Sequence, residues 1–251
     1  MKKSHSRWLQ KFLCLCLVAL VSNSVAAQEA VQSTDTAARA ENLPKGINDA
    51  FLDPELDVET YVKRFEVESR EVFSCRAQIL KAIALEPGMA VADVGAGTGL
   101  YMSPLSRSVG ENGKVYAIDI SPKFVKHLRQ RAKDEGLENV DVVFCSDRDV
   151  NLKPSSVDRV FICDVYHHFE YPESSLKSIY NAMRSGGQLV LVDFHRSPKE
   201  ANEQRSQWLA GHIRADQSVF KQEIIDAGFE FIDEVDVDGF SENYLLRFSK
   251  K

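Results

Sequence analysis

The stretch VADVGAGTG, which runs from Val91 to Gly99, decides the predicted fold. In it an apolar run is interrupted by an acid and then gives way to three glycines within five residues. Glycine adopts positive φ at little steric cost and lets a ligand come close to main-chain N–H groups, because it has no Cβ. The stretch therefore predicts a buried strand that ends in a nucleotide-binding turn.

Strands and helices alternate on the C-terminal side of this stretch. Short runs rich in Val, Ile and Leu predict strands at 89–94, 114–120, 140–145, 157–165 and 187–194. Helical patterns lie between them, at 100–109, 121–136 and 172–184. Near-continuous apolar strands separated by helices predict an α/β fold with a parallel sheet covered on both faces.

The two ends of this region carry different patterns. Residues 53–85 form two helical segments, which a Pro-Gly pair stops. After a helix over 218–227, strands at 229–237 and 244–249 are joined by DGFSEN, a connection short enough for an antiparallel hairpin. The sequence therefore predicts one open sheet with a hairpin at its edge.

The spacing of the glycines separates two kinds of nucleotide. A nicotinamide dinucleotide fingerprint has the spacing G-x-G-x-x-G, but its third glycine position is Leu100 here, and Asp93 would repel a pyrophosphate. An acid at this place can instead bind an ammonium group, while a helix N-terminus receives a carboxylate. The turn is therefore suited to the amino-acid end of a ligand.

Two further acids end the next strands. Asp119 ends the second strand, where a carboxylate can accept hydrogen bonds from both hydroxyls of a ribose. Asp147 ends the third strand, beside the expected position of an adenine. Amino acid, ribose and adenine together describe S-adenosylmethionine.

With these motifs the sequence resembles the class I S-adenosylmethionine-dependent methyltransferases. VADVGAGTG is similar to their glycine motif, YAIDIS to their ribose acid, CSDRD to their adenine loop, CDVYHHF to their fourth-strand motif and MRSGGQLVLVDF to the turn into strand five. The resemblance covers Glu68 to the C-terminus. It implies a Rossmann-like, seven-stranded, mostly parallel sheet of order 3-2-1-4-5-7-6, with strand seven antiparallel and helices on both faces.

The resemblance also implies the residues that contact the methyl donor. They are Asp93, Gly95, Gly97, Asp119, Asp147 and Asp164, with Arg148 as a further neighbour of the adenine. Gly99 belongs to the same motif, although it could serve helix packing instead of contact. A glycine loop alone is often only a tight turn, and a strand-end acid often caps the next helix. The order of all these residues favours cofactor binding.

Candidates for a catalytic base follow the fourth strand. Orientation of an acceptor behind an activated methyl supplies on the order of 7 to 11 kcal/mol, whereas a general base supplies about 3 to 5 kcal/mol. Tyr166, His167 and His168 are the candidates, although one histidine could pack under the next helix while the other faces water. We expect no metal site here, because adjacent histidines point in different directions and no third ligand has suitable spacing.

Two segments are expected to close the pocket. The helices before the sheet carry aromatic and basic residues, and we interpret them as a cap over the cofactor or as an amphipathic layer on the sheet. The connection 195–215 is long for an α/β unit, and long connections at the active end are commonly lids. Candidates on the substrate side, each also explicable as structural, are His195, Trp208, His212 and Arg214.

The first residues have the composition of a secretory signal peptide. Four basic residues precede the apolar run from Phe12 to Val21, and small residues before Gln28 suit cleavage after Ala27. We predict a signal peptide at 1–27, a flexible linker at 28–46, and a methyltransferase domain with an N-terminal helical cap at 47–251. We expect the cleaved product to be exported to the periplasm, without stable membrane insertion.

The net charge and the absent motifs limit the chemical class of the methyl acceptor. Loss of 1–27 leaves 27 Lys and Arg against 37 Asp and Glu, and such an acidic chain is a poor nucleic-acid binder. Motifs that methylate bases are absent from the sequence, so we expect a small-molecule substrate and no nucleic-acid partner. The three cysteines that remain have no CxxC spacing and are interpreted as small buried hydrophobes.

Export leaves a second hypothesis open, because S-adenosylmethionine is made in the cytosol. An exported, non-catalytic protein of the same fold that binds a nucleoside or S-adenosylmethionine is the alternative to an exported methyltransferase. A dehydrogenase ranks third, because the glycine spacing and the acid before it disfavour a nicotinamide dinucleotide.

Overall fold

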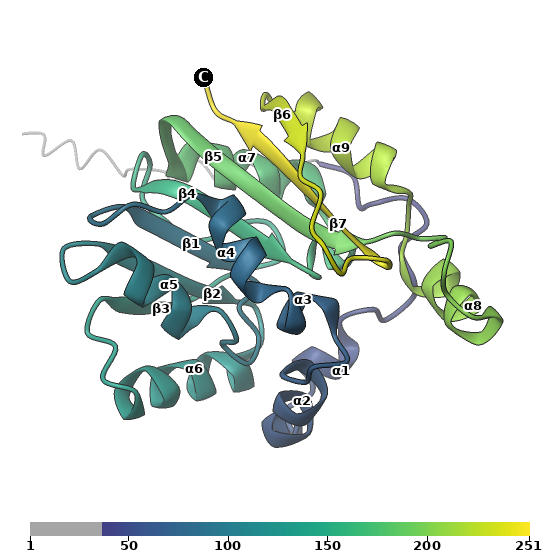
Figure 1. Ribbon diagram of the computed structural model, residues 1–251, viewed down its shortest axis with the longest axis horizontal. Helices are drawn as coiled ribbons and strands as arrows, with labels where there is room; N and C mark the ends of the chain where they lie inside the picture. Colours follow the sequence, from purple (N-terminus) through teal and green to yellow (C-terminus); the bar gives the residue numbers. More distant parts are fainter. Residues whose placement is uncertain (1–36) are drawn as a thin grey trace, which may run out of the picture. The chain divides into compact units, whose positions relative to one another are not determined.

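The computed structural model describes residues 37–251, so the predicted signal peptide at 1–27 and the first part of the predicted linker lie outside the described residues. Seven strands form one sheet of order β3-β2-β1-β4-β5-β7-β6 (Figure 1). The strands are β1 (Ala90–Val94), β2 (Lys114–Asp119), β3 (Val140–Phe144), β4 (Val157–Cys163), β5 (Met183–Phe194), β6 (Glu230–Glu234) and β7 (Asn243–Ser249).

The first five strands are parallel, and β7 runs antiparallel between β5 and β6. The strand order and the antiparallel β7 confirm both expectations for the sheet. The chain leaves β1 for β2 on one side and returns to β4 on the other, with Val94 opposite Ile118 and Ile162. The order of the strands therefore reverses beside β1, which is where open α/β sheets bind their ligands.

Helices cover both faces of the sheet and its carboxyl edge. They are α1 (Asp49–Leu52), α2 (Val58–Phe65), α3 (Glu71–Ser74), α4 (Arg76–Ile83), α5 (Met102–Val109), α6 (Pro122–Asp134), α7 (Pro172–Ala182), α8 (Glu203–His212) and α9 (Gln217–Asp226), with a 3-10 turn η1 (Tyr166–His168). Helices α4, α5 and α6 pack on one face, and α7 and α9 pack on the other.

Successive side chains of a strand point to opposite faces of the sheet, so each strand contributes to both helical layers. In β1, Val91 packs with α4 and α5, whereas Ala92 and Val94 pack in the cluster that holds α7 and α9. All five residues of this strand are buried, as expected for a central parallel strand. Asp93 is the one charged residue of this strand, and it is buried. It follows Val91 by two positions and so lies on the same face of the sheet.

Capping explains where the helix after β2 begins. Ser121 precedes the helix, and its hydroxyl accepts a hydrogen bond from the N–H of Phe124, while Pro122 takes the first helical position. The predicted start of this helix is therefore confirmed, and the chain turns directly from the acid that ends β2 into α6.

Two boundaries differ from the prediction. The helix expected over 172–184 ends at Ala182, and β5 begins at Met183, because the last residues of that pattern are drawn into the sheet beside Val157. The segment 53–85 divides into three short helices instead of two, and α1 before them has no signal in the sequence.

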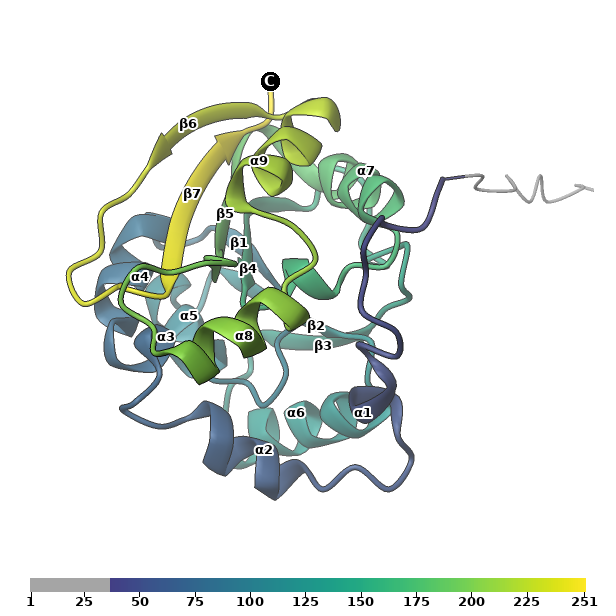
Figure 2. The same cartoon turned by 90° about the vertical axis from the view of Figure 1, so that its right-hand side faces the viewer.

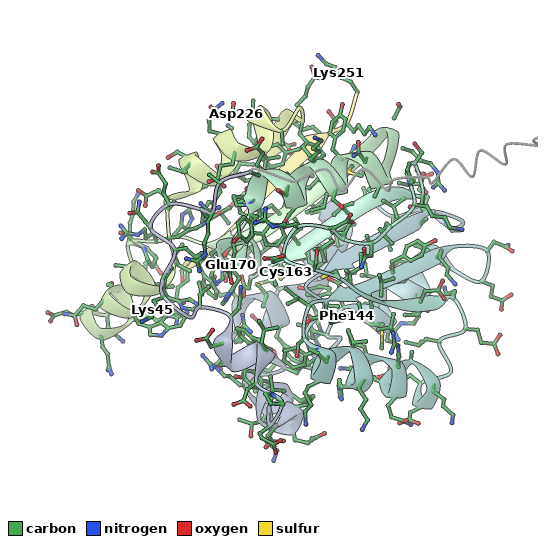
Figure 3. The ribbon with its side chains drawn as sticks, turned by 180° about the vertical axis from the view of Figure 1, so that it is seen from behind. Lys45, Phe144, Cys163, Glu170, Asp226 and Lys251 are labelled. Carbon is green, nitrogen blue, oxygen red and sulfur yellow. The ribbon has the colours of Figure 1, made fainter. Side chains whose placement is uncertain are left out.

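Several short elements meet at the edge where the parallel strands end. Helices α1, α2 and α8 lie there, on segments far apart in the chain (Figure 2). Within the predicted linker, the described part passes over Glu170, whose carbonyl accepts a hydrogen bond of 2.7 Å from the N–H of Ala40 (Figure 3). A search of residues 37–251 for a helix able to cross a membrane finds none.

Candidate active site

The glycine turn after β1 uses its amides within the fold. The N–H of Gly95 donates to the carbonyl of Ile118, and the N–H of Gly97 donates to Oδ2 of Asp119, each over 2.8 Å. Both glycines have positive φ. These amides therefore tie the turn to β2, and the expected free amides facing a ligand carboxylate are not found at these two positions.

The two glycines differ in the space around them. A Cβ added to Gly95 would lie 2.4 Å from Cγ1 of Val165, whereas one added to Gly97 would meet nothing closer than the carbonyl oxygen of Gly95, at 3.9 Å. Gly95 thus allows the loop after β4 to approach the turn, and Gly97 leaves open space over it. Both residues line two neighbouring cavities.

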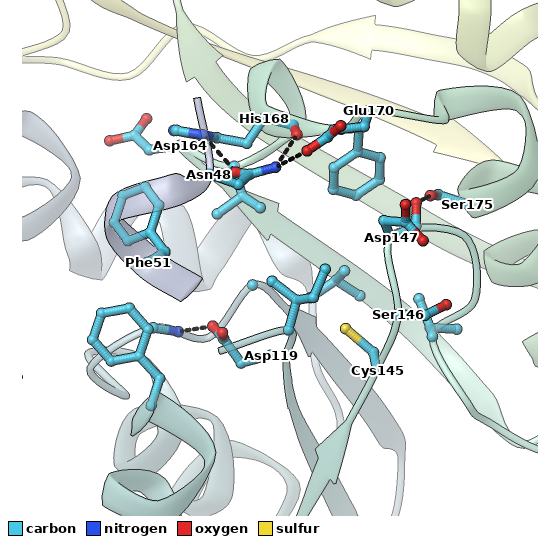
Figure 4. A pocket seen from close by; sticks show the side chains of 18 of the residues that line it. Asn48, Phe51, Asp119, Cys145, Ser146, Asp147, Asp164, His168, Glu170 and Ser175 are labelled. Carbon is cyan, nitrogen blue, oxygen red and sulfur yellow. Dashed lines mark hydrogen bonds between the residues drawn. The ribbon is translucent and has the colours of Figure 1, made fainter. Parts of the chain in front are cut away.

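The first cavity lies over the ends of β2 and β3. Figure 4 shows Asp119 and Cys145 on one wall, facing Phe51 and His168 on the other, with Asp147 at the side. Burial raises the pKa of Asp119 to about 6, although hydrogen bonds from Ser121 and Gly97 lower it. The cavity thus combines a mainly apolar wall with the buried carboxylate of Asp119, which already accepts backbone hydrogen bonds.

Asp93 and Asp164 add two buried acids beside the turn. Burial raises the pKa of each to about 7, and the charge of Asp119 contributes at Asp93. The side chain of Asp164 accepts hydrogen bonds from Arg70 and, over 2.7 Å, from the amide of Asn243. Asp164 lines both cavities and so lies where they adjoin, at the passage from one to the other.

The second, larger cavity runs from the glycine turn toward α8. It is lined by Asp93, Gly97 and Asp164. The predicted lid 195–215, here called the lid segment, also contributes Arg205, Trp208 and His212. The side chain of Arg205 packs over the ring of Trp208, with 4.5 Å to the ring centroid. A ligand in the first cavity and a second molecule in the larger one would therefore share the passage at Asp164.

His167 is buried and held by an acid behind it. Its Nδ1 lies 2.6 Å from Oδ1 of Asp193, whose two oxygens also accept hydrogen bonds from the N–H groups of Phe194 and His167. Burial lowers the pKa of His167 to about 3 and raises that of Asp193 to about 7. We assign the shared proton to Nδ1 of His167, because the two backbone donors favour an ionised Asp193.

His168 and His212 complete a cluster with His167. The ring centroids of His167 and His168 are 4.3 Å apart, and the ring of His212 lies 5.1 Å from the first and 5.2 Å from the second. One nitrogen from each of the three rings lies within 4.8 Å of the others. The expectation that the adjacent histidines diverge and lack a third partner is therefore wrong, because α8 folds back over η1.

A family model described as a methyltransferase domain matches residues 92–191. The chain is 26% identical over 179 residues to the ubiquinone/menaquinone biosynthesis C-methyltransferase UbiE of Shewanella frigidimarina, which covers 61% of this chain and 71% of that protein. The UbiE of Escherichia fergusonii is 29% identical over 171 residues, covering 58% and 68%. A solved S-adenosylmethionine-dependent methyltransferase of Aquifex aeolicus superposes with a TM-score of 0.66 at 25% identity, covering 76% of this chain and 97% of that one.

The chain carries a class I S-adenosylmethionine-dependent methyltransferase domain. The domain is that of a methyltransferase enzyme, and S-adenosylmethionine is its methyl donor. The residues present fit this donor, because a buried acid ends β2, further acids line the passage, and the open face of Gly97 leaves room beside them. Six of the eight predicted contact residues line the larger cavity, the smaller one or both: Asp93, Gly95, Gly97, Asp119, Asp147 and Asp164.

Two of the predicted contact residues, Gly99 and Arg148, have other surroundings. Gly99 lines neither cavity, and a Cβ there would lie 2.8 Å from Leu128 of α6, so this glycine serves helix packing. The guanidinium of Arg148 lies over the ring of Tyr171, 3.3 Å from its centroid, and the residue lines neither cavity. Asp147, in contrast, lines the first cavity as expected.

Tyr166, a predicted catalytic residue, lies away from both cavities. Its side chain is fully buried, and its hydroxyl donates to Oε2 of Glu223 over 2.7 Å. It packs against Phe220 of α9 and lines neither cavity. The histidines that follow it turn toward the larger cavity because η1 rotates successive side chains to different sides.

The structure adds residues that no sequence pattern singles out. Asn48 joins the cap of the methyltransferase domain to η1, since its amide donates to the carbonyl of His168 and to Glu170, each over 3.1 Å. Asn243 holds Asp164 from the start of β7. A single asparagine outside any motif or period carries no signal, so contacts alone identify these two.

Proposed function

We propose that this domain transfers the methyl group of S-adenosylmethionine to a small-molecule acceptor bound in the larger cavity. The observation that carries the proposal is the joint lining by Gly95, Gly97 and Asp164, which makes the two cavities neighbours. A donor whose adenine and ribose occupy the first cavity would reach with its amino-acid end into the second, where it would meet the acceptor. The aromatic and basic side chains of the lid segment stand on the acceptor side.

Each buried acid is assigned a part of the donor. Asp119 would accept hydrogen bonds from the ribose hydroxyls, and Asp147 would lie beside the adenine. Asp93 would face the ammonium group, because a cation offsets the cost of an ionised carboxylate in a buried site. These assignments support a donor whose sulfonium methyl points toward Asp164 and the larger cavity.

Methyl transfer then proceeds by in-line attack. An electron pair of the acceptor forms the new bond to the methyl carbon while the bond from carbon to sulfur breaks, and sulfur keeps that pair as a thioether. Holding the two reactants in line supplies on the order of 7 to 11 kcal/mol. A proton lost by the acceptor can pass to an unprotonated imidazole nitrogen of the cluster, so His167 and His168 remain the proposed proton acceptors.

An acceptor with a largely apolar body fits the walls of the larger cavity. Phe51, Tyr61, Phe65, Phe194 and Trp208 line it. Relatives of the chain are named as C-methyltransferases of quinone biosynthesis. We therefore propose that the acceptor is a small ring or chain compound and that carbon is among the atoms methylated.

Calorimetry with S-adenosylhomocysteine tests the donor site. Wild type should bind it, and Asp119→Ala should bind about 10-fold to 100-fold more weakly, because hydrogen bonds to a charged acceptor contribute about 1.5 to 3 kcal/mol. Asp134→Ala, at the exposed end of α6, is the matched control and should bind as wild type does. No binding by wild type, or equal binding by Asp119→Ala, would contradict the proposal.

A labelled-methyl assay tests the acceptor. Quinols, phenols and apolar carbon acids are offered with radiolabelled S-adenosylmethionine, and organic extracts are counted. Label in one of these classes supports a small apolar acceptor. Label only in nucleic acid or protein would contradict it.

We also propose that the chain is exported and cleaved after Ala27. Support comes from the basic residues before the apolar run from Phe12 to Val21 and from the small residues before Gln28. After expression in a bacterium, N-terminal sequencing of the periplasmic fraction should begin at Gln28. A chain that stays in the cytosol with its first residues intact would contradict this proposal.

A further inference from the structure

Three imidazole rings converge in the larger cavity from two distant parts of the chain. His167 and His168 come from η1, and His212 comes from the last turn of α8. Their candidate ligand nitrogens lie within 4.8 Å of one another, and all three residues line the larger cavity. Three protein ligands with the remaining positions open to a cavity is the arrangement of catalytic zinc sites.

The hydrogen bonds around His167 and His168 fix which nitrogen faces the cluster. Nδ1 of His167 is engaged by Asp193, as described above. Nδ1 of His168 lies 3.1 Å from Oδ1 of Asn48, and the amide nitrogen of that asparagine already donates to two oxygens, so Oδ1 accepts and Nδ1 donates. Both rings therefore keep an Nε2 lone pair free for a ligand.

These partners have the chemistry of the outer layer of a metal site. A histidine that binds a metal commonly donates its other N–H to a carboxylate or a carbonyl oxygen, which orients the ring and raises its basicity. Oδ1 of Asp193 accepts such a hydrogen bond from His167, and Oδ1 of Asn48 accepts one from His168. Two of the three rings are thus held in the orientation that a metal ion requires.

His212 is the adjustable member of the cluster. Its ring stacks on Trp208, with centroids 4.5 Å apart, and within residues 37–251 neither of its nitrogens has a hydrogen-bond partner. A tetrahedral zinc ion with nitrogens at about 2.0 to 2.1 Å separates its ligands by about 3.4 Å. A small rotation of the partly exposed His212 ring would bring the cluster toward that spacing.

We propose that His167, His168 and His212 bind one divalent transition-metal ion of the zinc class, with open coordination positions that face the larger cavity. Neutral imidazoles suit Zn²⁺ and its neighbours better than Mg²⁺ or Ca²⁺, which prefer oxygen ligands. The nearby guanidinium groups of Arg64 and Arg205 favour an anionic fourth ligand over water. An ionised acceptor or a hydroxide meets this requirement.

The role of the ion rests on the proposed methyl transfer. An acceptor hydroxyl or thiol that takes an open position would lose its proton to a metal-bound hydroxide, which leaves as water. Its electron pair would then attack the methyl carbon as the bond to sulfur breaks. With the ion bound, the metal-bound hydroxide would take the proton that the metal-free histidines would otherwise accept, and the histidines would act as ligands.

Metal titration of the full-length chain, made without a histidine tag and stripped with a chelator, tests the site. Co²⁺ should give the visible absorption of a four- or five-coordinate nitrogen site at one ion per chain, and Zn²⁺ should displace it. His212→Ala should weaken Zn²⁺ binding by at least about 100-fold, because losing a ligand exceeds the 10-fold to 100-fold loss typical of an outer partner.

His195→Ala is the matched control, since this histidine contacts Tyr244 and does not belong to the cluster. It should bind Zn²⁺ as wild type does. If His212→Ala does not fold, as thermal unfolding would show, His212→Gln replaces it. No stoichiometric binding by wild type, or binding by a folded His212 variant equal to that of wild type, overturns the proposal.

S-adenosylhomocysteine binding is measured on the same samples. Metal binding without binding of this nucleoside would remove the proposed function and leave the metal site standing. Nucleoside binding without metal binding would do the reverse, so the two failures are distinguishable.

Discussion

At the residue scale, Gly95 and Gly97 share a backbone conformation for two different physical reasons. Both have positive φ, but only Gly95 has a side chain, Val165, in the space of a Cβ. Gly95→Ala should lower the free energy of unfolding by about 2 to 4 kcal/mol, of which about 1 to 2 kcal/mol comes from positive φ and the rest from overpacking.

Gly97→Ala is the matched variant for this prediction. It should cost only the conformational part, about 1 to 2 kcal/mol, yet it should weaken S-adenosylhomocysteine binding because its Cβ enters open space over the turn. Denaturant titration and calorimetry measure the two effects. Equal destabilisation by both substitutions would show that the contact with Val165 is not the deciding one.

The buried acid Asp119 predicts how donor affinity depends on pH. Its pKa is raised to about 6 in the free protein, so below about pH 6 it takes up a proton. A protonated carboxyl accepts poorly from ribose hydroxyls, so affinity should fall by up to about tenfold per pH unit below that pKa. Asp93 and Asp164, each with a pKa of about 7, should begin the decline at higher pH.

Calorimetry with S-adenosylhomocysteine from about pH 8 to about pH 5 measures this dependence. Asp119→Asn should bind more weakly at the high end and show a shallower slope, because one of the titrating groups is gone. An affinity that stays constant over this range would mean that the donor does not select the ionised acid.

At the element scale, one carboxylate fastens α3 to the start of β7. Oε1 of Glu71 accepts from the N–H and the hydroxyl of Ser241, and Oε2 accepts from the N–H groups of Glu242 and Asn243. Asn243 in turn holds Asp164. The link between cap and sheet therefore passes through Glu71 to the edge of both cavities.

Glu71→Gln should lower the free energy of unfolding by about 1 to 3 kcal/mol, because one of its two acceptors becomes a donor that faces backbone N–H groups. Glu68→Gln, whose side chain is exposed and 3.8 Å from Arg76, should change it by less than about 0.5 kcal/mol. Denaturant titration measures the free energy of unfolding of the two variants. Similar stabilities would mean that this link contributes little.

At the scale of the whole molecule, donor binding joins the ends of several strands. S-adenosylhomocysteine at about 100 times its Kd should stabilise the native domain by about 2.7 kcal/mol, which raises Tm by about 5 to 10 °C for a domain of this size. Thermal unfolding with and without the nucleoside measures it. Asp119→Ala at the same concentration should show a smaller shift, and an equal shift would place the binding elsewhere.

Much of the fold could be predicted because its signals are local. The apolar runs of β1 and β4 and the cap at Ser121 are each read from a few neighbouring residues, and parallel strands bring their ends to one edge. Asp93 and Asp119 were selected from the strand ends, and Asp164 from the family resemblance. All three line a cavity at that edge of the sheet.

The sequence by itself determined the sheet, its order through the family resemblance, and the edge of the sheet at which both cavities lie, because these depend on period, turn chemistry and chain direction. Only the tertiary structure decided that Tyr166 points into the core, that Arg148 lies over Tyr171, and that His212 joins His167 and His168. Those outcomes depend on how η1 and α8 pack against each other, and packing between distant segments leaves no local pattern in the chain.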